Sequence, residues 1–237
     1  MNNSTITQIK NLKKDFPMGK GVFTALQNIN ISIKAGEFLG LIGPSGSGKT
    51  TLLNIIGSLD ICTDGEVTVL DKNVSTLSQI EAANLRSVYL GFIFQTYNLL
   101  PVYTVFENVE LPLLLLKQSQ SKRKRAVEDA LEWVGLSDKI NSKPAQLSGG
   151  ECQRVSIARA MVKKPKIVLA DEPTANLDAE NSHHILKTMK SLNSELNTTF
   201  VFATHDEKVI QYLHRKISLV DGQVVNDEKV TNNTIGD

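Results

Sequence analysis

The strongest chemical signal in the sequence is a glycine-rich segment between an apolar run and a helical run. Residues 43–50 read GPSGSGKT and follow the apolar run 37–42, which fits the pattern G-x-x-x-x-G-K-[ST] in its required context. The glycines let successive amide N–H groups turn toward one phosphate group, and the following helix adds the positive end of its dipole. In such a loop Lys49 reaches the β- and γ-phosphates and Thr50 ligates Mg²⁺. We therefore expect a nucleoside triphosphate site here, and not a Gly-Ser loop without a ligand.

Two adjacent carboxylates follow a second apolar run. Asp171 and Glu172 come directly after residues 167–170, which have the composition of a buried strand. A carboxylate at the carboxyl edge of a parallel strand faces the ligand crevice of an α/β sheet. Asp171 is suited to contact Mg²⁺ through water, and Glu172 to polarise a water for in-line attack on the γ-phosphorus. The alternative is a solvated strand end, which the phosphate loop in the same chain makes the weaker interpretation.

A second candidate anion site begins another helix. Ser148 precedes Gly149 and Gly150, and a helical stretch follows over residues 152–162. A hydroxyl, free amides and a helix dipole can together bind an anion, although a serine in this position can also be an ordinary N-cap. Two phosphate-type sites cannot easily reach one γ-phosphate within a single copy. The two sites can serve one γ-phosphate if one of them belongs to a second copy of the chain.

Short strand-like runs alternate with longer helical runs, which predicts a mostly parallel α/β sheet. Between residues 104 and 164 helical patterns dominate, and one helix is expected from residue 121 to about residue 134. We interpret its basic first turn as solvated, against the alternative of a phosphate or lipid patch. Asp221 and Gly222 predict a tight hairpin turn after the last strand. The strands are expected at residues 37–42, 67–70, 91–94, 166–170, 199–203 and 216–220, with a helix over residues 48–58.

Composition limits the function classes. The chain has 237 residues, of which 41% are apolar and 22% charged, as in an ordinary soluble globular protein of one or two domains. The formal net charge of +1 gives no reason to expect nucleic acid as a partner. No window of about 18 uninterrupted apolar residues is present, and the N-terminus lacks a signal pattern. We therefore expect a cytoplasmic protein whose membrane role would come through a partner chain.

Six motifs in a fixed order carry a family resemblance. They are the Walker A loop at 43–50, a Q-loop glutamine at Gln95, the signature LSGGE at 147–151, Walker B with its glutamate at Asp171 and Glu172, a D-loop at 176–178, and a switch histidine at His205. In this order they resemble the nucleotide-binding subunit of ABC transporters over nearly the whole chain. The resemblance implies an α/β P-loop NTPase fold with a RecA-like core, an N-terminal antiparallel β subdomain and a helical subdomain. It places the core with the β subdomain at residues 1–94 and 151–225 and the helical subdomain at 95–150. The polar composition of residues 226–237 predicts a loose tail.

The resemblance also implies roles for individual residues. Two ATP molecules would lie between two copies arranged head to tail, each contacting Walker A of one copy and the signature of the other. Gln95 would sense Mg²⁺ and couple the site to a membrane partner, His205 would contact the γ-phosphate, and Asp178 would help join the two sites. Phe16 resembles the aromatic residue that stacks on adenine, the alternative being a core phenylalanine.

The complete set of expected site residues follows from the motifs and the resemblance together. Catalytic roles are expected for Glu172, His205, Gln95 and Lys49, and Mg²⁺ contacts for Thr50, Gln95 and Asp171. Nucleotide contacts are expected for Phe16, Gly43, Pro44, Ser45, Gly46, Ser47, Gly48, Lys49, Thr50, Thr51, Ser148, Gly149, Gly150 and Asp178. Cys152 lies near a helix N-terminus, where a thiolate would be stabilised, but we expect it to be an inert small residue.

A narrower resemblance concerns the partner. Residues 94–101 (FQTYNLLP) and 107–112 (ENVELP) are similar to the macrolide-export and lipoprotein-release branch, the MacB and LolD types. This implies an ATPase on the cytoplasmic side of the inner membrane, peripheral to integral permease subunits and serving export or lipoprotein release. The alternative is a soluble ABC ATPase that acts in repair or translation, which the single cassette and the lack of zinc-type cysteine spacing disfavour. A regulatory module without hydrolysis is a third reading, against which Glu172 argues.

Overall fold

The computed structural model describes residues 4–230, which form two β-sheets with helices around them. The larger sheet has the strand order β10-β9-β3-β8-β7-β6, in which β9 to β6 are parallel and β10 pairs antiparallel with β9 at one edge. Its central strands β3 and β8 are buried on both faces, which explains their continuous apolar sequences. The strands are β3 (Phe38–Ile42), β6 (Leu90–Ile93), β7 (Ile167–Asp171), β8 (Thr199–Thr204), β9 (Arg215–Val220) and β10 (Gln223–Lys229).

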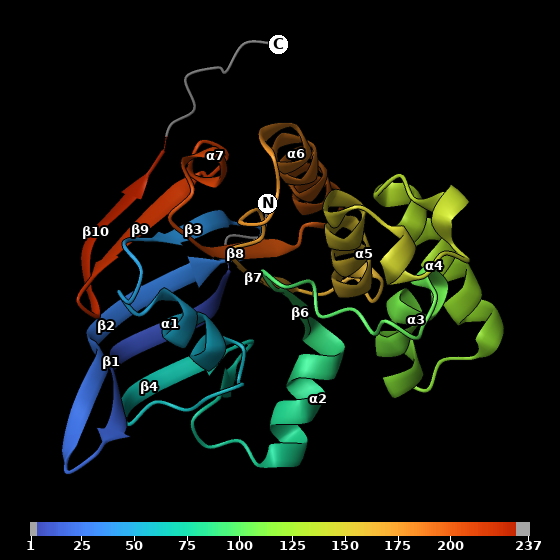
Figure 1. The fold of residues 1–237 in the computed structure, drawn as a ribbon. Coiled ribbons are helices and arrows are strands. Elements are labelled where there is room, and N and C mark those ends of the chain that lie inside the picture. The colour runs from blue at the N-terminus through green and yellow to red at the C-terminus, as the bar shows by residue number, and fades with distance from the viewer. Residues whose placement is uncertain (1–3, 231–237) are drawn as a thin grey trace.

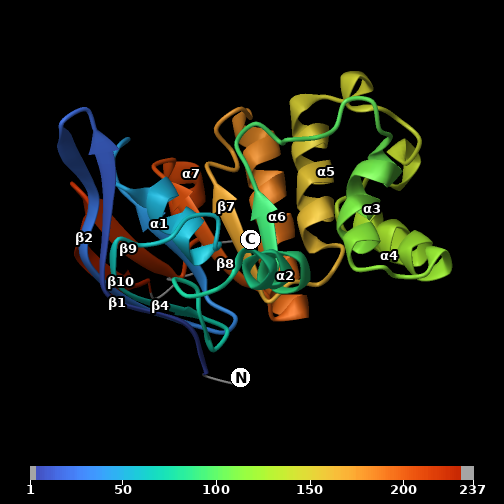
Figure 2. The ribbon, with the colours of Figure 1, turned by 90° about the horizontal axis from the view of Figure 1, so that it is seen from below.

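The smaller sheet is antiparallel, with the strand order β2-β1-β4-β5. It consists of β1 (Thr5–Met18), β2 (Gly21–Lys34), β4 (Asp64–Val69) and β5 (Lys72–Asn73). The long β1–β2 hairpin lies at the end of the molecule opposite α3 and α4 (Figures 1 and 2). The α/β class, the parallel strands and the N-terminal antiparallel sheet are thus confirmed.

Helices cover both faces of the larger sheet. Helix α1 (Lys49–Ile56) lies between the two sheets, where its leucines and isoleucines share one apolar cluster with β1, β2 and β3. Helices α5 (Gly149–Met161) and α6 (Ala179–Leu196) pack on the other face (Figure 2). The remaining helices are α2 (Gln79–Tyr89), α3 (Val105–Leu115), α4 (Gln120–Trp133) and α7 (Glu207–Ile210), with short 3₁₀ turns at Ser137–Lys139 and Pro144–Gln146. No helix within residues 4–230 is long and apolar enough to cross a membrane.

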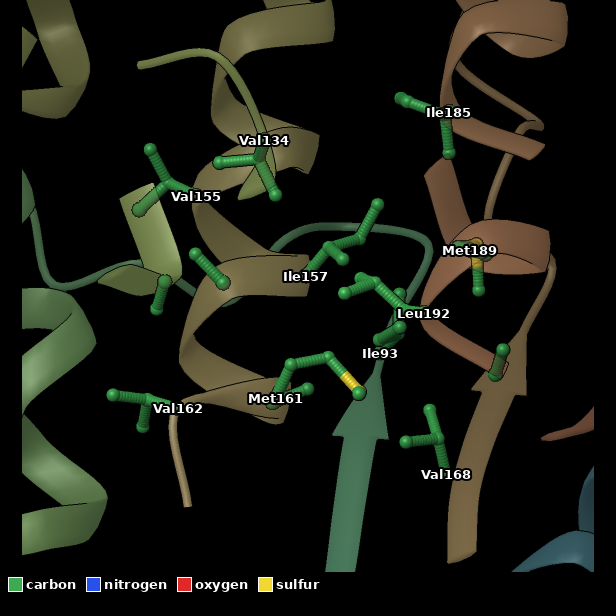
Figure 3. Packing of buried hydrophobic residues seen from close by; sticks show 14 of the residues in the cluster. Ile93, Val134, Val155, Ile157, Met161, Val162, Val168, Ile185, Met189 and Leu192 are labelled. Carbon is green, nitrogen blue, oxygen red and sulfur yellow. The ribbon is translucent and has the colours of Figure 1, made fainter. Parts of the chain in front are cut away.

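Helix α5 is buried from two sides and connects the sheet to the helical segment. Ile157 and Met161 point toward Val168 of β7 and Leu192 of α6, whereas Val162 points the opposite way (Figure 3). The helix also packs against α3 and α4. A helix that is apolar on two faces must be enclosed by two layers. The sheet and the helices of residues 105–162 therefore share one core, and the division at residues 94/95 and 150/151 stays a prediction.

The first residues of the predicted C-terminal tail form part of an edge strand. The prediction of a loose tail from Asn226 is wrong for residues 226–229, because β10 continues to Lys229 and pairs with β9. Asp227 in this strand forms an ion pair of 2.7 Å with Arg215. Polar side chains are normal on an exposed edge strand, and they concealed the strand in the sequence. Residues 231–237 of the predicted tail lie outside the described residues.

Helix α2 is not predicted by the pattern of apolar residues, although its first turn carries a recognisable start signal. Ser78 accepts a hydrogen bond from the Glu81 amide at 3.3 Å, and the Glu81 carboxylate accepts one from the Ser78 amide at 2.9 Å. This reciprocal capping box follows the pattern S-x-x-E. Only Leu85 of the helix is buried, so the apolar periodicity that marks most helices is weak here.

The basic first turn of α4 is mostly solvated, as predicted. Lys122, Lys124 and Arg125 are exposed. Arg123 differs, because it is half-buried and its guanidinium lies 2.7 Å from the Glu110 carboxylate of α3. One member of the charge run therefore joins two helices, and the other three face solvent.

A buried asparagine fixes the loop that follows β6. Asn108 of α3 is fully buried, and its Oδ1 accepts a hydrogen bond from the Leu100 amide at 2.8 Å. Its Nδ2 donates to the carbonyls of Leu100 at 3.1 Å and Thr104 at 3.0 Å. One side chain thus satisfies backbone groups at both ends of the segment 100–104, which has no strand or helix partner of its own.

Replacement of Asn108 by alanine is expected to lower the free energy of unfolding by about 1–3 kcal/mol, because the buried Leu100 amide loses its partner and the Leu100 and Thr104 carbonyls each lose one hydrogen bond. Urea denaturation measures the change. Asn84→Ala, at an exposed position on α2, is the matched control and is expected to change stability by less than about 0.5 kcal/mol. Equal effects of the two variants would show that the Asn108 hydrogen bonds do not hold the loop.

Candidate nucleotide-binding site

Three strand ends meet at one edge of the larger sheet. The loop after β3, the carboxylates that end β7 and His205 after β8 lie together, because these strands are parallel neighbours in the order β3-β8-β7. A cavity of about 440 Å³ opens at this edge. It is lined by Phe16, Phe23, Ala25, Ser45, Gly46, Gly48, Lys49, Thr50, Thr51, Gln95, Asp171, Glu172, Ala175 and His205.

The phosphate loop has a shape that requires glycine. Gly43 and Gly48 have φ values of +151° and +98°, a region in which other residues are strained. A Cβ atom at Gly48 would also lie 2.8 Å from the Ala25 carbonyl oxygen. Gly48 is the N-cap of α1 and offers no side chain to the first-turn amides. In contrast to α2, α3 and α5, which begin with capping boxes, α1 leaves its N-terminal amides available for an anion.

The Lys49 side chain forms hydrogen bonds with the backbone of the phosphate loop. Its Nζ donates hydrogen bonds to the carbonyls of Gly43 and Pro44, both at 2.8 Å. Burial lowers the pKa of this ammonium, and the neighbouring Glu172 and Asp171 carboxylates oppose that shift. Gly43 and Pro44 therefore stabilise the loop through their carbonyl groups, and they do not line the cavity. Ser47 is buried and does not line the cavity either.

An oxygen-rich pair joins the loop to β7. The Thr50 hydroxyl lies 3.1 Å from each carboxylate oxygen of Asp171. Burial raises the pKa of Asp171, while the hydrogen bond from Thr50 lowers it. Gln95 adds an amide to the same cavity. Hydroxyl, carboxylate and amide oxygens are the ligand types that Mg²⁺ prefers, so these three residues fit the ion that the sequence implies.

Glu172 is held by partners on both of its oxygens. Its Oε1 lies 2.6 Å from His205 Nδ1, and its Oε2 accepts a hydrogen bond from the Thr204 hydroxyl at 3.1 Å. Its backbone has φ of +44°, which is uncommon for a residue with a side chain and persists only when the surroundings fix it. The carboxylate is 15% exposed and the histidine ring 63% exposed. The cavity therefore holds a fixed carboxylate that can accept a proton, beside a ring that solvent reaches.

The signature residues and Asp178 lie elsewhere in the same chain. The Ser148 hydroxyl accepts a hydrogen bond from the Glu151 amide at 3.2 Å, and the Glu151 carboxylate accepts one from the Ser148 amide at 2.7 Å. Asp178 caps α6 through the Asn181 amide at 2.8 Å. Ser148, Gly149, Gly150 and Asp178 do not line the cavity. Within one copy the structure thus shows the N-cap role of Ser148 and leaves its role toward a nucleotide as a prediction.

Phe16 lies in the cavity and not in the core. Its ring is 36% exposed, and Lys14 Nζ lies 4.7 Å from the ring centroid. Phe23 pairs with it in register across the β1–β2 hairpin and is 51% exposed. The motifs do not indicate Phe23, but the turn at Gly19 and Lys20 places residues 16 and 23 at equal distances from its centre. Two aromatic rings therefore stand at the mouth of the cavity, where a purine base can stack.

Cys152 has the surroundings of an inert thiol. Burial raises the pKa of the Cys152 thiol, and the Glu151 carboxylate adds to that shift. Desolvation and the neighbouring carboxylate therefore disfavour the thiolate form of Cys152.

Comparison with known proteins places these features in one family. The family model described as ABC transporter matches residues 26–175. The chain is 45% identical over 228 residues to the ABC transporter ATP-binding protein MJ0796 of Methanocaldococcus jannaschii, covering 94% of this chain and 97% of that protein. It is 42% identical over 223 residues to the lipoprotein-releasing system ATP-binding protein LolD of Francisella tularensis, covering 94% and 96%. It is also 42% identical to the macrolide export ATP-binding/permease protein MacB of Pasteurella multocida, but spans only 36% of the length of that protein.

Solved structures agree with the sequence comparison. A dimeric structure of MJ0796 in a post-hydrolysis state, bound to ADP and Pi, has a TM-score of 0.88 at 43% identity and covers 95% of this chain and 99% of that chain. CbiO1 of Clostridium perfringens, part of the ABC transporter complex cbiONQ, has a TM-score of 0.86 at 27% identity, covering 95% and 88%.

Phe16→Ala is expected to weaken ATP binding about 5- to 150-fold, because stacking of an aromatic side chain on a base contributes about 1–3 kcal/mol. Phe16→Tyr keeps a ring and is expected to bind ATP like the wild type. Equilibrium binding of ATP and of inorganic triphosphate to each variant separates stacking from a general loss of structure.

The matched control is Val22→Ala on β2, which is 67% exposed but does not line the cavity. It is expected to leave ATP affinity unchanged. If Phe16→Ala weakened ATP and inorganic triphosphate equally, the ring would not be the base-binding surface.

Proposed function

The chain belongs to the ABC transporter family as an ATP-binding and ATP-hydrolysing cassette, and we propose that two copies bind two ATP molecules head to tail and drive a membrane permease. The proposal of a dimer rests on which motifs line the nucleotide cavity of one copy. A single copy places the phosphate loop, Asp171, Glu172, Gln95 and His205 around one cavity, while the signature lies outside it. The site of one copy therefore lacks the second anion-binding element that the sequence provides.

A second copy supplies that element in the proposed dimer. Ser148 and Gly149 are exposed at the start of α5, where a hydroxyl and a helix N-terminus can meet a phosphate of the partner's ATP. Glu151 holds Ser148 in its N-cap conformation through two reciprocal hydrogen bonds. The dimeric structure of the similar protein MJ0796 supports this arrangement.

In the proposed reaction the chain's own groups hold the phosphates and accept a proton. The loop amides and Lys49 bind the β- and γ-phosphates. Glu172, fixed by His205 and Thr204, accepts the proton of the attacking water. Mg²⁺ would be held by Thr50, Gln95 and, through water, Asp171, and when bound would neutralise phosphate charge. We expect the exposed ring of His205 to contact the γ-phosphate.

A groove next to the nucleotide cavity is the proposed docking site of the permease. It has a volume of about 520 Å³ and lies between α2, α3 and the end of α5. Apolar side chains such as Leu111 and Leu115 of α3 line it, and so do Phe94 and Asn98. Gln95, in the same short segment, lines the nucleotide cavity instead. A single loop therefore borders both sites, which supports coupling between ATP and the permease.

The similarity to LolD and MacB supports a permease of that branch, with the cassette peripheral to the cytoplasmic face of the membrane. The proposed cargo process is export or lipoprotein release. No feature of the described residues favours the alternative of a soluble ATPase in repair or translation.

Glu172→Gln is expected to reduce ATP turnover by about 10²- to 10⁴-fold, the range of a general base. ATP binding is retained because the phosphate loop is intact, so ATP-bound dimer accumulates. Phosphate release and light scattering with ATP measure the two effects.

Glu207→Gln is the matched control, because it neutralises an exposed carboxylate in α7 just beyond His205. It is expected to hydrolyse ATP at the wild-type rate and to accumulate no dimer. Turnover at the wild-type rate in Glu172→Gln would remove the proposed role of this carboxylate, and a turnover-deficient monomer would contradict the proposed dimer.

A further inference from the structure

The docking groove combines an apolar lining with three cations. Arg86 of α2, Arg159 of α5 and Lys163 just after α5 all line it, together with the apolar side chains of α3 and β6. A purely apolar partner segment would leave three cations beside it without a counter-ion. The positive charge of the groove therefore restricts the kind of partner segment that can bind there.

These cations are bound only by backbone carbonyls. Lys163 Nζ donates to the carbonyls of Arg86 and Ser87, both at 2.7 Å. Arg86 donates to Ser58 O at 2.6 Å, and Arg159 donates to the carbonyls of Tyr97 and Asn98 at 2.6 Å.

The ion pairs of the chain lie elsewhere. Across residues 4–230, no carboxylate lies within 4.0 Å of any of the three cations, and the pairs that do form join other residues. Arg123 and Arg215, by comparison, each contact a carboxylate directly at 2.7 Å. The cationic character of the groove is thus a local feature, since the whole chain has a net charge of only +1.

Lys163 combines a desolvated ammonium with a donor that its carbonyl partners do not use. Burial lowers the pKa of Lys163 to about 8, because a desolvated ammonium without a counter-ion is destabilised relative to the neutral amine. An ammonium has three N–H donors, and two of them are used by the carbonyls of Arg86 and Ser87. A carboxylate that enters the groove would find both an available donor and a favourable charge.

We propose that the permease segment that binds this groove is amphipathic and carries an Asp or Glu carboxylate that pairs with Lys163 and the two arginines. The inference rests on the proposed function, because it concerns the permease that the cassette serves. The apolar lining selects for a protein segment with apolar side chains, and the three cations select for an acidic one. The predicted partner is therefore an integral membrane protein whose groove-binding segment has an acidic residue among apolar ones.

Zero-length crosslinking in native membranes tests this pairing directly. A carbodiimide activates a carboxylate, the neutral Lys163 amine attacks it, and an amide bond forms as the reagent leaves as its urea. Activation removes the charge of the carboxylate, so the low pKa of about 8 that burial gives Lys163 leaves part of this amine neutral and reactive near pH 7.5. Peptide mass spectrometry is expected to find Lys163 joined to an Asp or Glu of an integral membrane protein. Lys187, exposed on α6, is the control lysine and is expected to form no such link.

Charge variants test whether the pairing matters for binding. Capture of the same membrane protein by tagged cassette is expected to fall at least 10-fold in Lys163→Glu and to persist in Lys163→Arg, which keeps the charge but cannot form the amide. Lys187→Glu is the matched charge reversal and is expected to capture normally. Arg86→Glu repeats the test if the melting temperature shows that Lys163→Glu is unfolded.

The outcomes separate the inference from the proposed function. If the wild type captures a membrane protein, but Lys163 forms no crosslink and the Lys163→Glu and Arg86→Glu variants capture as well as the wild type, the acidic segment is refuted and the permease stands. If the wild type captures no membrane protein, the proposed function fails and the inference fails with it.

Discussion

The geometry of the site depends on three buried parallel strands that end at the same edge of one sheet. Because β3, β8 and β7 are neighbours, the phosphate loop, His205 and the Asp171–Glu172 pair meet without any long-range loop. The glycines after β3 then turn the chain so that α1 begins with uncapped amides at the cavity. The path of the backbone therefore positions the amides that can bind phosphate. The side chains at the same edge provide the groups for proton transfer and metal contacts.

Continuous apolar runs predicted the strands that are buried on both faces, whereas β1, β2 and the polar edge strand β10 did not follow a simple apolar pattern. β3 and β8 are continuous apolar runs, and the loop between β3 and α1 has a fixed spacing, so both were evident. β1 and β2 were expected only from the family resemblance, because register shifts between Ile9 and Lys14 interrupt their alternation. Phe23 was missed because its place in the cavity depends on hairpin register. The Ser148 contact with ATP stays a prediction, since one chain shows only its capping role.

One helix connects the two surfaces on which the proposed function depends. Helix α5 begins beside Ser148, at the proposed dimer contact, and Arg159 and Lys163 at its other end line the proposed permease groove. Thirteen helical residues span about 20 Å, and the helix is enclosed by apolar contacts on two faces. Arg159 also holds Tyr97 and Asn98, both with positive φ, in the loop that carries Gln95. A shift of α5 toward a second copy would therefore move the groove and the Gln95 loop together.

Disulfide formation between two copies measures most directly whether a second chain completes the site. In a background with Cys62→Ser and Cys152→Ala, one protein carries Ser45→Cys in the phosphate loop and another carries Ser148→Cys in the signature. The predicted result is a crosslink between unlike chains that forms in the mixture and only when ATP or a non-hydrolysable analogue is present. Wild-type ATP hydrolysis by chains that never crosslink in the mixture, with or without nucleotide, would contradict the head-to-tail dimer.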